Sequence, residues 1–575
     1  MKFSIVLLLF FTFSFLFRTD QSFDQDLGRH IKLGEIIIRT GQVPKTNLFS
    51  YTNGDFPFIN THWLFEVLAY IFAQANALQA LLILKIIVIL VSVWITLKII
   101  PPQNSALLLP IGFIFLHVLR ERLELRPEIF SFLFTALTLF ILTKFMDMKQ
   151  TLDGRYKFVS YWPILILPLI QLIWINIHIY FFIGLILQAI FLIYTGYQYL
   201  RFHPKGVNIK LPLIIFILSV LISLLNPNGL QGLLYPLNVT KNYGYTIVEN
   251  QTMFLLESIN FKDPNFLFVK ISVGIVILSM VFTLFSRAFD FKNILLTLTG
   301  VTLTLLNVRS FPYLVFLSLP ATLQNFGVIK LKGLTLSLSL VACILLLFES
   351  YSYLNGDYYR FRDDPHKVGL EFEENVKGAV DFILANKLPQ PIFNNFDIGS
   401  YIIYRGYPQY QVFVDGRPEA YPAQFFTGIY IPAQTDYDNF KEVEKFYGFK
   451  TIIFSHTDQT PWAKTFLSAV LKDEVWKLVY IDDFMVVLTK FEASEEKKLT
   501  TVNLSNLTPT SYSFDNHLSY LRLGIFLLNN QYPGGVQFVQ KALQIFPNSP
   551  AANAIMANLT GQAIFWGKSK SKFFW

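Results

Sequence analysis

The sequence predicts a polytopic α-helical membrane protein with an α/β domain toward its C-terminal end. Hydrophobic residues make up 53% of the 575 residues and charged residues only 15%, which is too apolar for a soluble globular protein. Apolar runs long enough to cross a bilayer recur through the first 350 residues. After residue 351 these runs stop, and short strand-like and helix-like patterns take their place.

The first apolar segment, Phe3–Phe17, resembles a signal peptide because Met1-Lys2 precedes it. It lacks a small-residue cleavage site, and Arg18-Thr19-Asp20 follows it, so we interpret it as an uncleaved span with a cytoplasmic N-terminus. A cleaved signal is the alternative. Ten further segments bring the expected total to about eleven transmembrane helices: 78–97, 105–119, 129–145, 161–176, 180–198, 211–225, 266–285, 293–307, 311–326 and 334–350.

The connections expected on the cytoplasmic side are basic, as the positive-inside rule requires. They carry Lys98, Lys144, Lys149, Arg155, Lys157, Arg201, Lys205, Lys210, Arg287, Lys292, Lys330 and Lys332. This distribution explains the net charge of +8 without a nucleic-acid partner. An odd number of spans places the chain after residue 351 outside, so we expect a multi-pass cell-membrane protein with an extracytoplasmic C-terminal domain.

The expected domains are a transmembrane domain (1–350, with a first outer loop at 18–62), an outer α/β domain (351–491), a polar linker (492–515) and a helical tail (516–575). The tail resembles one tetratricopeptide unit in Tyr520–Gly524, Lys541-Ala542 and Phe546-Pro547. One such unit cannot bury its own face, so we expect it to pack on the α/β domain or on a protein partner. The basic end, Lys568–Lys572, is expected to fray. The outer domain should contain strands at Gln390–Asn395, Gln411–Val414, Thr451–Ser455 and Trp476–Tyr480, and helices at Val376–Lys387, Tyr437–Tyr447 and Trp462–Leu471.

The unusual polar residues all fall at the expected outer ends of spans, which predicts one external site assembled from several helix ends. Asp24 and Asp26 follow the first span directly. One of these carboxylates could take a proton from an acceptor hydroxyl, or either could cap a helix at Leu27–Arg39. Both interpretations are open on the residues alone.

A cluster of arginines and glutamates, Arg120 to Glu128, joins two spans at the outer side. Arg122 and Arg126 are four residues apart, and guanidinium groups bind phosphate in a bidentate manner. Internal Arg–Glu pairing is the alternative. Arg309 is a further charge at an outer end, where it could meet a phosphate or Glu249 and Glu257.

Trp174-x-Asn176-x-His178 suggests a pocket, with a structural histidine as the alternative, and Asn226–Gly229 is typical of a turn. No His or Cys spacing indicates a metal site, and no nucleotide-binding glycine motif is present. Asp24, Asp26 and Glu66 could together bind Mg²⁺ or Mn²⁺, although their spacing does not demand it.

Taken together these motifs resemble a group of uncharacterised bacterial multi-pass proteins in the GT-C glycosyltransferase superfamily. The resemblance covers residues 1–350 and extends to the outer domain. It is carried by Asp24-x-Asp26-(x)3-His30-(x)3-Gly34-Glu35, Gly41-x-x-Pro44-(x)4-Phe49-Ser50-x-Thr52, His62-Trp63-Leu64-x-Glu66, Arg126-Pro127-Glu128-(x)2-Ser131, Trp174-x-Asn176-x-His178, Asn226-Pro227-x-Gly229 with Tyr235-Pro236, and Arg309.

The resemblance implies a membrane glycosyltransferase that takes a sugar from a polyprenyl-phosphate donor at the outer face, with inversion. It assigns the general base to Asp26, with Asp24 second, and the donor phosphate to Arg126 and Arg309, with Arg122 as a weaker candidate. The acceptor pocket would include His30, Trp63, Glu66, Asn176 and His178. The acceptor would be a glycan, lipid or protein.

The outer domain carries a fainter parallel. Asn394–Tyr401 and Val414–Arg417 resemble the soluble-domain motif of this group and the W-W-D-Y-G motif of oligosaccharyltransferases. Asn395 and Phe396 stand where that motif has tryptophans, so sequon recognition is not implied. Asp397, Asp415 and Arg417 would line an acceptor cleft, with a structural turn as the alternative. A non-catalytic scaffold or a lipid or glycan transporter on the same fold is the competing function.

Overall fold

The computed structural model describes residues 1–102, 106–145, 148–150, 156–158, 162–202, 209–238, 241–259, 261, 263–285, 290–328, 332–490 and 499–561. Several basic residues of the expected cytoplasmic connections (Arg155, Lys205, Arg287 and Lys330) lie outside these residues, as do the C-terminal run Lys568–Lys572 and residues 492–498 of the expected linker. Two compact units account for the chain. Unit 1 comprises Met1–Arg18, Ile59–Lys241 and Thr246–Leu354, and unit 2 comprises Thr19–Phe58, Asn242–Tyr245 and Asn355–Trp575.

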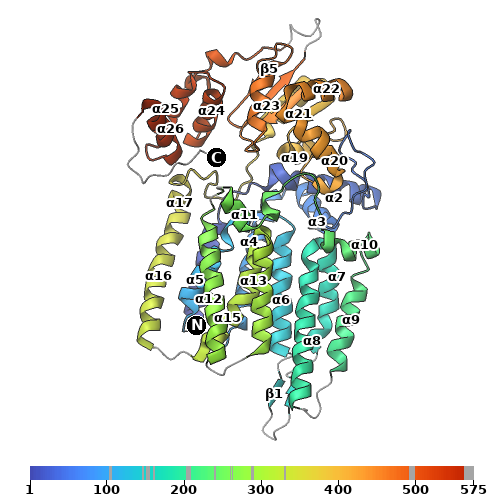
Figure 1. The fold of residues 1–575 in the computed structure, drawn as a ribbon, viewed down its shortest axis with the longest axis vertical. Helices are drawn as coiled ribbons and strands as arrows, with labels where there is room; N and C mark the ends of the chain where they lie inside the picture. Colours follow the sequence, from blue (N-terminus) through green and yellow to red (C-terminus); the bar gives the residue numbers. More distant parts are fainter. Residues whose placement is uncertain are drawn as a thin grey trace. The chain divides into compact units, whose positions relative to one another are not determined.

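Unit 1 is a bundle of long apolar helices that run alongside one another (Figure 1). Its helices are α1 (Lys2–Leu16), α3 (Trp63–Gln74), α4 (Leu78–Ile99), α5 (Leu108–His117), α6 (Glu128–Phe145), α7 (Leu167–Ile177), α8 (Phe182–Phe202), α9 (Lys210–Ile222), α10 (Gly229–Leu234), α11 (Met253–Ser258), α12 (Asn265–Phe285), α13 (Phe291–Leu306), α14 (Phe311–Tyr313), α15 (Leu319–Asn325) and α16 (Lys332–Leu354). A two-stranded hairpin, β1 (Met148–Gln150) with β2 (Tyr156–Phe158), joins α6 to α7.

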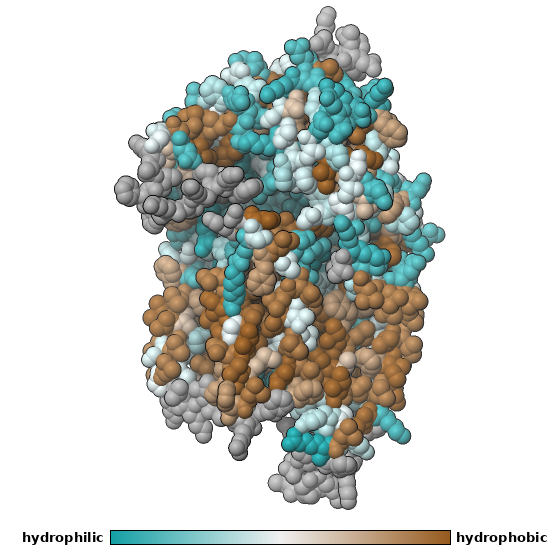
Figure 2. All heavy atoms as spheres, viewed as in Figure 1, coloured by the Kyte–Doolittle hydropathy of each residue, from teal (hydrophilic) through white to brown (hydrophobic). Residues whose placement is uncertain are grey.

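The surface of this bundle is apolar where a soluble protein would be polar (Figure 2). Among the described residues, four helices are long and apolar enough to cross a membrane: α4, the stretch Ile179–Arg201, α12 and α16. Six shorter apolar helices accompany them. Every one of the eleven apolar segments expected from the sequence contains helix in the structure. A mainly helical fold with helices long and apolar enough to cross a membrane is therefore confirmed, whereas the number of eleven crossing segments stays a prediction.

Unit 2 is built around a four-stranded sheet with the strand order β3-β4-β6-β5. β3 (Ile392–Asn394) pairs in parallel with β4 (Thr451–Ser455), and β6 (Met485–Thr489) is antiparallel to both β4 and β5 (Lys477–Ile481). The helices of unit 2 are α2 (Gly28–Thr40), α17 (Asp357–Arg360), α18 (Lys377–Asn386), α19 (Gly399–Gly406), α20 (Ala423–Phe425), α21 (Ile431–Thr435), α22 (Tyr437–Tyr447), α23 (Ala463–Val470), α24 (His517–Asn529), α25 (Gly535–Ile545) and α26 (Pro550–Thr560).

The core of unit 2 is aromatic. The buried ring of Phe393 on β3 lies 4.8 Å from Phe413, 5.1 Å from Phe449 and 5.3 Å from Phe466 between ring centroids. Such ring pairs are favourable beyond the area that they bury, so they fix the position of the sheet. Helix α22 is bounded as its sequence suggests, because the Asp436 side chain accepts the Asp438 N–H and Gly448 ends the helix at a φ of 66°.

Two sequence-based expectations for unit 2 are corrected by the structure. Gln411–Val414 was expected to be a strand, but Val412 makes only a single isolated bridge, to Ser50. The segment is buried without joining the sheet, and its apolar pattern comes from packing in the aromatic core. Strand β6 was not expected from the sequence, although its five residues are all buried and it lies between β4 and β5 in the sheet.

The first loop is grouped differently from the sequence-based division, which placed it with the transmembrane part. Residues Thr19–Phe58 form their compact contacts with the C-terminal half of the chain, within unit 2. Asp20 forms a parallel bridge with Phe372, and its N–H donates to the Glu371 carbonyl at 2.9 Å. Unit 2 is therefore assembled from segments that are far apart in the sequence.

Candidate functional site

Three arginines from two helix connections of unit 1 converge on one carboxylate. Arg122 ends the short 3₁₀ turn Arg120–Arg122 between α5 and α6, and Arg126 lies just before α6. Arg309 lies in the 3₁₀ turn Val308–Ser310 between α13 and α14. The carboxylate belongs to Glu249, in the 3₁₀ turn Val248–Asn250 before α11. We call Arg122, Arg126, Arg309, Glu128 and Glu249 the arginine cluster.

Both oxygens of Glu249 are used in this cluster. Its Oε1 lies 2.5 Å from Nη1 of Arg122 and 2.6 Å from Nη1 of Arg126, and its Oε2 lies 3.0 Å from Nη2 of Arg309. Burial raises the pKa of Glu249, but Arg122, Arg126 and Arg309 together outweigh that effect and hold it well below its usual range. Glu249 is therefore an ionised anion in a site built for anions.

A second carboxylate fixes Arg122 independently of Glu249. Nη2 of Arg122 lies 2.9 Å and 3.1 Å from the two oxygens of Glu128, at the first residue of α6. The Arg122 and Glu128 side chains are 8% and 7% exposed, whereas those of Glu249 and Arg309 are 26% and 28% exposed. Arg122 is thus held by the buried carboxylate of Glu128, and Glu249 and Arg309 are the more accessible residues of the arginine cluster.

His178 lies where the chain breaks between α7 and the next helical turn. Its backbone is extended, with φ of −156° and ψ of 143°. The buried ring is held at Nδ1, which lies 2.7 Å from the Ser131 hydroxyl oxygen, and that oxygen also accepts the indole N–H of Trp174 at 2.7 Å. The His62 ring lies 5.4 Å from the His178 ring. Two predicted motifs, Arg126–Ser131 and Trp174–His178, thereby meet at one serine.

Trp63 and Asn176 are brought together by a direct hydrogen bond. The Trp63 indole N–H donates to Oδ1 of Asn176 at 2.7 Å. The Asn176 amide in turn donates to the backbone carbonyls of Leu172 and Leu225, at 2.8 and 3.0 Å. Every polar atom of this buried amide is thus used to fix helix ends, which favours a positioning role.

The turn expected at Asn226–Gly229 joins the same network. Oδ1 of Asn226 accepts the Asn228 N–H at 2.9 Å, and the Asn228 side chain donates to the Asn60 carbonyl at 3.0 Å. The Asn60 amide donates to Oε2 of Glu66 at 2.6 Å. Glu66 is 1% exposed, so it takes part in this network from a buried position on α3.

Asp24 and Asp26, the predicted catalytic pair, lie in unit 2 within a single π-helical turn, Phe23–Leu27, that continues into α2. Neither side chain caps a helix, because the turn begins after Ser22 and α2 follows it without a break. The alternative interpretation as helix caps is therefore wrong. The carboxylate of Asp20, just before this turn, accepts the Ser22 N–H at 3.0 Å.

The two carboxylates have different surroundings. Asp24 is 5% exposed, and its Oδ2 accepts the Asn375 N–H at 2.9 Å. Its Oδ1 is buried with no hydrogen-bond partner among the described residues. Burial raises the pKa of Asp24 to about 8. Asp26 is 23% exposed at its side chain and forms an ion pair with Arg29, with 3.0 Å between Oδ1 and Nη2.

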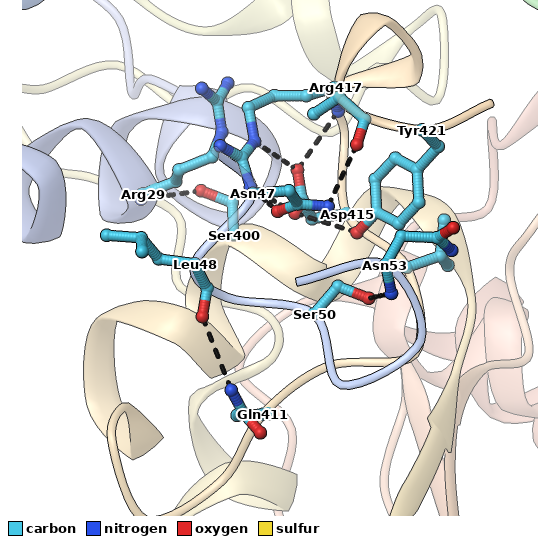
Figure 3. Close-up of polar contacts among 12 residues, drawn as sticks. Arg29, Asn47, Leu48, Ser50, Asn53, Ser400, Gln411, Asp415, Arg417 and Tyr421 are labelled. Carbon is cyan, nitrogen blue, oxygen red and sulfur yellow. Dashed lines mark hydrogen bonds and ion pairs between the residues drawn. The ribbon is translucent and has the colours of Figure 1, made fainter. Parts of the chain in front are cut away.

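Asp415 and Arg417 form a buried ion pair that binds the first loop (Figure 3). The Arg417 guanidinium donates to both Asp415 oxygens at 2.7 Å and to Oδ1 of Asn47 at 2.6 Å. Tyr421 donates its hydroxyl to Asp415 at 3.0 Å. The Arg417 guanidinium also lies 5.2 and 4.8 Å from the ring centroids of Phe49 and Phe58.

This geometry does not favour the prediction that Asp415 and Arg417 line a substrate cleft. Their side chains are 0% and 1% exposed, and their charged atoms already have protein partners. Nearby, the Ser400 hydroxyl accepts the Arg29 N–H at 2.8 Å (Figure 3). The Asp415–Arg417 pair and Ser400 thus both hold the first loop within unit 2.

The remaining predicted residues lie in distinct settings. His30 is buried on α2. Asp397 is exposed in a short 3₁₀ turn, Phe396–Ile398, that follows β3. Among the residues that the structure describes, no three His, Cys, Asp or Glu side chains gather as potential metal ligands. The divalent cation therefore stays an expectation from the sequence.

Two pairings were not predicted from the sequence: Ser131 as the partner of His178, and Glu249 as the centre of the arginine cluster. A signal existed for Glu249, since it was named as an alternative partner of Arg309. The position of that carboxylate in a loop 123 residues after Arg126 had no counterpart in any local pattern.

Comparison with solved structures shows a related fold. The chain resembles the archaeal oligosaccharyltransferase AglB from Archaeoglobus fulgidus, solved in complex with an inhibitory peptide and a dolichol-phosphate. The TM-score is 0.55 at 10% identity, and the similarity covers 95% of this chain and 86% of that one. No family model and no curated protein matches the sequence. At this identity the likeness shows a related fold alone.

Proposed function

We propose that this protein is a membrane glycosyltransferase that moves a sugar from a polyprenyl-phosphate donor to an acceptor at the outer face of the cell membrane. The observation that carries the proposal is the arginine cluster. Arg122, Arg126 and Arg309 all contact Glu249 in a unit whose helices are apolar. A bundle of this kind is a suitable place to bind a lipid that carries a phosphate.

The donor phosphate is assigned to this cluster because guanidinium groups match phosphate oxygens in charge and geometry. The dolichol-phosphate in the AglB structure is consistent with a lipid-linked donor on this fold. In the transfer step the bond between the sugar carbon and the phosphate oxygen breaks as the acceptor atom attacks from the opposite side. The arginines stabilise the charge that develops on the leaving phosphate.

Asp26 is our first candidate for the general base, and Asp24 is the second. Asp26 is more accessible than Asp24 and is paired with a cation, Arg29. In this role it takes the proton that the acceptor loses as the new glycosidic bond forms. Asp24, with a pKa raised to about 8, would hold a proton at neutral pH and so would first have to release it.

The acceptor pocket is assigned to His30, Trp63, Glu66, Asn176, His178 and Asp397. Of these, Asp397 is exposed, whereas Glu66, Asn176 and His178 are buried and held by protein partners. We assign positioning roles to Trp63 and Asn176. We assign to Asp415 and Arg417 the task of holding the first loop, which carries the proposed base, against the outer domain. The acceptor would be a glycan, lipid or protein, and helices α24–α26 offer a surface for a protein partner.

The proposal is tested by deleting the gene and profiling cell-surface glycans and glycolipids by mass spectrometry. The deletion is complemented with wild type, Asp26→Asn, Asp24→Asn or Arg309→Ala at equal membrane levels. Asp55→Asn, an exposed carboxylate of the same loop, is the matched control. We expect wild type and Asp55→Asn to restore a lost sugar, Asp26→Asn to restore none, and Arg309→Ala to restore at most a tenth.

Restoration by both Asp24→Asn and Asp26→Asn would contradict a catalytic role for this turn. A non-catalytic scaffold or a lipid or glycan transporter would then become the better explanation. A lipid-linked sugar that accumulates in the Asp26→Asn strain would separate these outcomes, because a transferase that binds its donor but cannot use it leaves the donor unconsumed.

A further inference from the structure

Glu249 occupies the place in the arginine cluster that an anionic ligand would take. Three guanidinium groups point their N–H donors at its two oxygens, at distances of 2.5, 2.6 and 3.0 Å. The same donors would bind the oxygens of a phosphate. A phosphate and Glu249 would therefore compete for the same N–H groups.

The charge of the cluster leads to the same conclusion. Three arginines face two carboxylates, Glu128 and Glu249, which leaves one positive charge in excess. Withdrawal of Glu249 leaves two positive charges in excess. That suits the lipid phosphate released by the proposed transfer, a monoester with a charge of about −1.5 to −2 at neutral pH. With both Glu249 and that phosphate present, the cluster would be negative in a partly desolvated site.

Glu128 and Glu249 differ in how readily each could leave. Glu128 is 7% exposed at the start of α6 and is bonded through both oxygens to one nitrogen of Arg122. Glu249 is 26% exposed and lies in a three-residue turn with extended residues, Ile247 and Gln251, on either side. The loop is also held through Gln251, whose carbonyl accepts the Val308 N–H at 3.0 Å, so the Glu249 side chain can move without releasing the loop.

The arginines have capacity left for a ligand. The Nε atoms of Arg122 and Arg309 are buried with no hydrogen-bond partner among the described residues. An unsatisfied buried N–H is costly, and more so on a charged group. A phosphate has more acceptor oxygens than a carboxylate, so it can satisfy donors that Glu249 leaves unmet.

We propose that Glu249 is an internal substitute for the lipid phosphate. It closes the arginine cluster when no phosphate-bearing lipid is bound, and it is displaced when one binds. This inference rests on the proposed function, because it takes the arginine cluster to be the donor-phosphate site. Arg122, anchored by Glu128, keeps its position during the exchange, whereas Glu249 rotates away from all three arginines.

The experiment measures ligand binding to the full-length protein in detergent by isothermal titration calorimetry. The probe is farnesyl phosphate, with farnesol and inorganic phosphate as comparisons. Glu249→Gln keeps the size of the side chain and removes its charge. Glu257→Gln is the matched control, because Glu257 is a partly exposed carboxylate on α11 that pairs with Lys270 at 2.6 Å and 2.8 Å.

We expect Glu249→Gln to bind farnesyl phosphate at least tenfold more tightly than wild type, and Glu257→Gln to bind as wild type does. Equal or weaker binding by Glu249→Gln would overturn the displacement. Glu249→Asp is a second variant for the case that Glu249→Gln does not fold. The Asp side chain is one methylene shorter, so its carboxylate should bind the arginines less tightly. The affinity of Glu249→Asp for farnesyl phosphate should therefore lie between those of wild type and Glu249→Gln.

Two further arms separate this inference from the proposed function. If Arg309→Ala does not weaken farnesyl phosphate binding, the cluster is not the phosphate site and both proposals fail. If Arg309→Ala weakens binding but Glu249→Gln does not strengthen it, only the displacement fails. Inorganic phosphate that binds as tightly as farnesyl phosphate would show that the site takes a free anion, which would overturn the lipid assignment.

Discussion

Oδ2 of Asp24 accepts the backbone N–H of Asn375 at 2.9 Å, a hydrogen bond between residues 351 positions apart in the chain. Both residues belong to unit 2, so the carboxylate next to the first apolar helix is held by the segment that leads into α18. Asp24 is therefore part of the structure of unit 2, whatever part it takes in chemistry.

The first prediction concerns the stability of unit 2 as a function of pH. The pKa of Asp24 is raised from 3.8 to about 8, so the folded protein retains a proton that the unfolded chain releases above pH 3.8. The stability from this group is fully present below pH 3.8 and decreases as the pH rises toward 8. We expect Asp24→Asn to flatten the pH profile of the unfolding free energy by up to about 1.4 kcal/mol per pH unit in this window.

The measurement is denaturant or thermal unfolding of the purified protein between pH 5 and pH 9, with Asp55→Asn as the control. Asp55 lies exposed in the same loop, and its removal should leave the slope as in wild type. An Asp24→Asn profile that parallels wild type throughout would show that Asp24 does not hold a proton in the folded state.

A second prediction follows from the buried Asp415–Arg417 pair. Asp415→Ala leaves the Arg417 guanidinium buried without its counter-charge, which typically destabilises a protein by about 3 to 5 kcal/mol. The double variant Asp415→Leu with Arg417→Met should be less destabilised than Asp415→Ala, since it buries no unpaired charge. Asp438→Ala, which removes an exposed pair with Lys441, should change the unfolding free energy by less than about 1 kcal/mol.

Thermal unfolding of these three variants in parallel provides the check. A double variant no more stable than Asp415→Ala would mean that the shape of the pair, with its bonds to Asn47 and Tyr421, matters more than its charge.

The third prediction concerns the hydrogen bond between Trp63 and Asn176. Trp63→Phe removes the indole N–H and leaves Oδ1 of Asn176 without that donor, at an expected cost of about 1 to 3 kcal/mol. Asn176→Ala also removes the two bonds to the Leu172 and Leu225 carbonyls, so it should cost more. In a double-mutant cycle the two changes should couple by about 0.5 kcal/mol or more. Strict additivity would show that the indole bond contributes nothing of its own.

A fourth prediction concerns the C-terminal helices and Asp363. One oxygen of the buried Asp363 lies 2.9 Å from Nε2 of His517 at the start of α24. The other accepts the Ser549 hydroxyl at 2.9 Å and the Ala551 N–H at 2.8 Å at the start of α26. We expect Asp363→Ala to speed proteolysis within α24–α26 by about tenfold, the effect of about 1.4 kcal/mol on a local opening equilibrium.

Asp363→Asn is the matched variant for this experiment. Asp363 has a φ of 51°, which asparagine tolerates better than alanine, and the Asn amide oxygen can still accept from Ser549 and Ala551. Its effect on proteolysis should be smaller than that of Asp363→Ala. Equal rates for wild type and Asp363→Ala would show that the hydrophobic contacts of the three helices suffice to dock them.

Local patterns in the sequence predicted much of the fold, because local rules govern those parts. Helix α22 and strand β4 have the predicted bounds, since Asp436 and Gly448 mark the helix ends and the strand has three consecutive apolar residues at its centre. Segment Gln411–Val414 was wrongly expected to be a strand because that prediction also used only the local pattern. It is as apolar as a strand, but its burial comes from Phe393 and other rings distant in sequence.

The sequence predicted which residue types form the candidate site, but not which residues pair with one another there. Arg122, Arg126 and Arg309 do gather, as expected of a phosphate site, but around Glu249. Asp415 and Arg417 were expected to face a substrate, because Val414–Arg417 resembles the soluble-domain motif of the GT-C group. Their partner Asn47 lies 370 residues before Arg417, and no local pattern reveals a pairing over that separation.

Unit 2 is made of segments far apart in the chain, and this sets the order in which the protein can fold during synthesis. Residues Thr19–Phe58 emerge early, but the rest of their unit begins at Asn355, after roughly 300 residues of membrane helices. At about 5 to 20 residues per second, the first loop waits roughly 15 to 60 seconds for the chain that buries Phe23 and Phe49. During that interval its apolar side chains have no native cover. In the nascent chain this loop is therefore open to non-native apolar contacts until the rest of unit 2 has been synthesised.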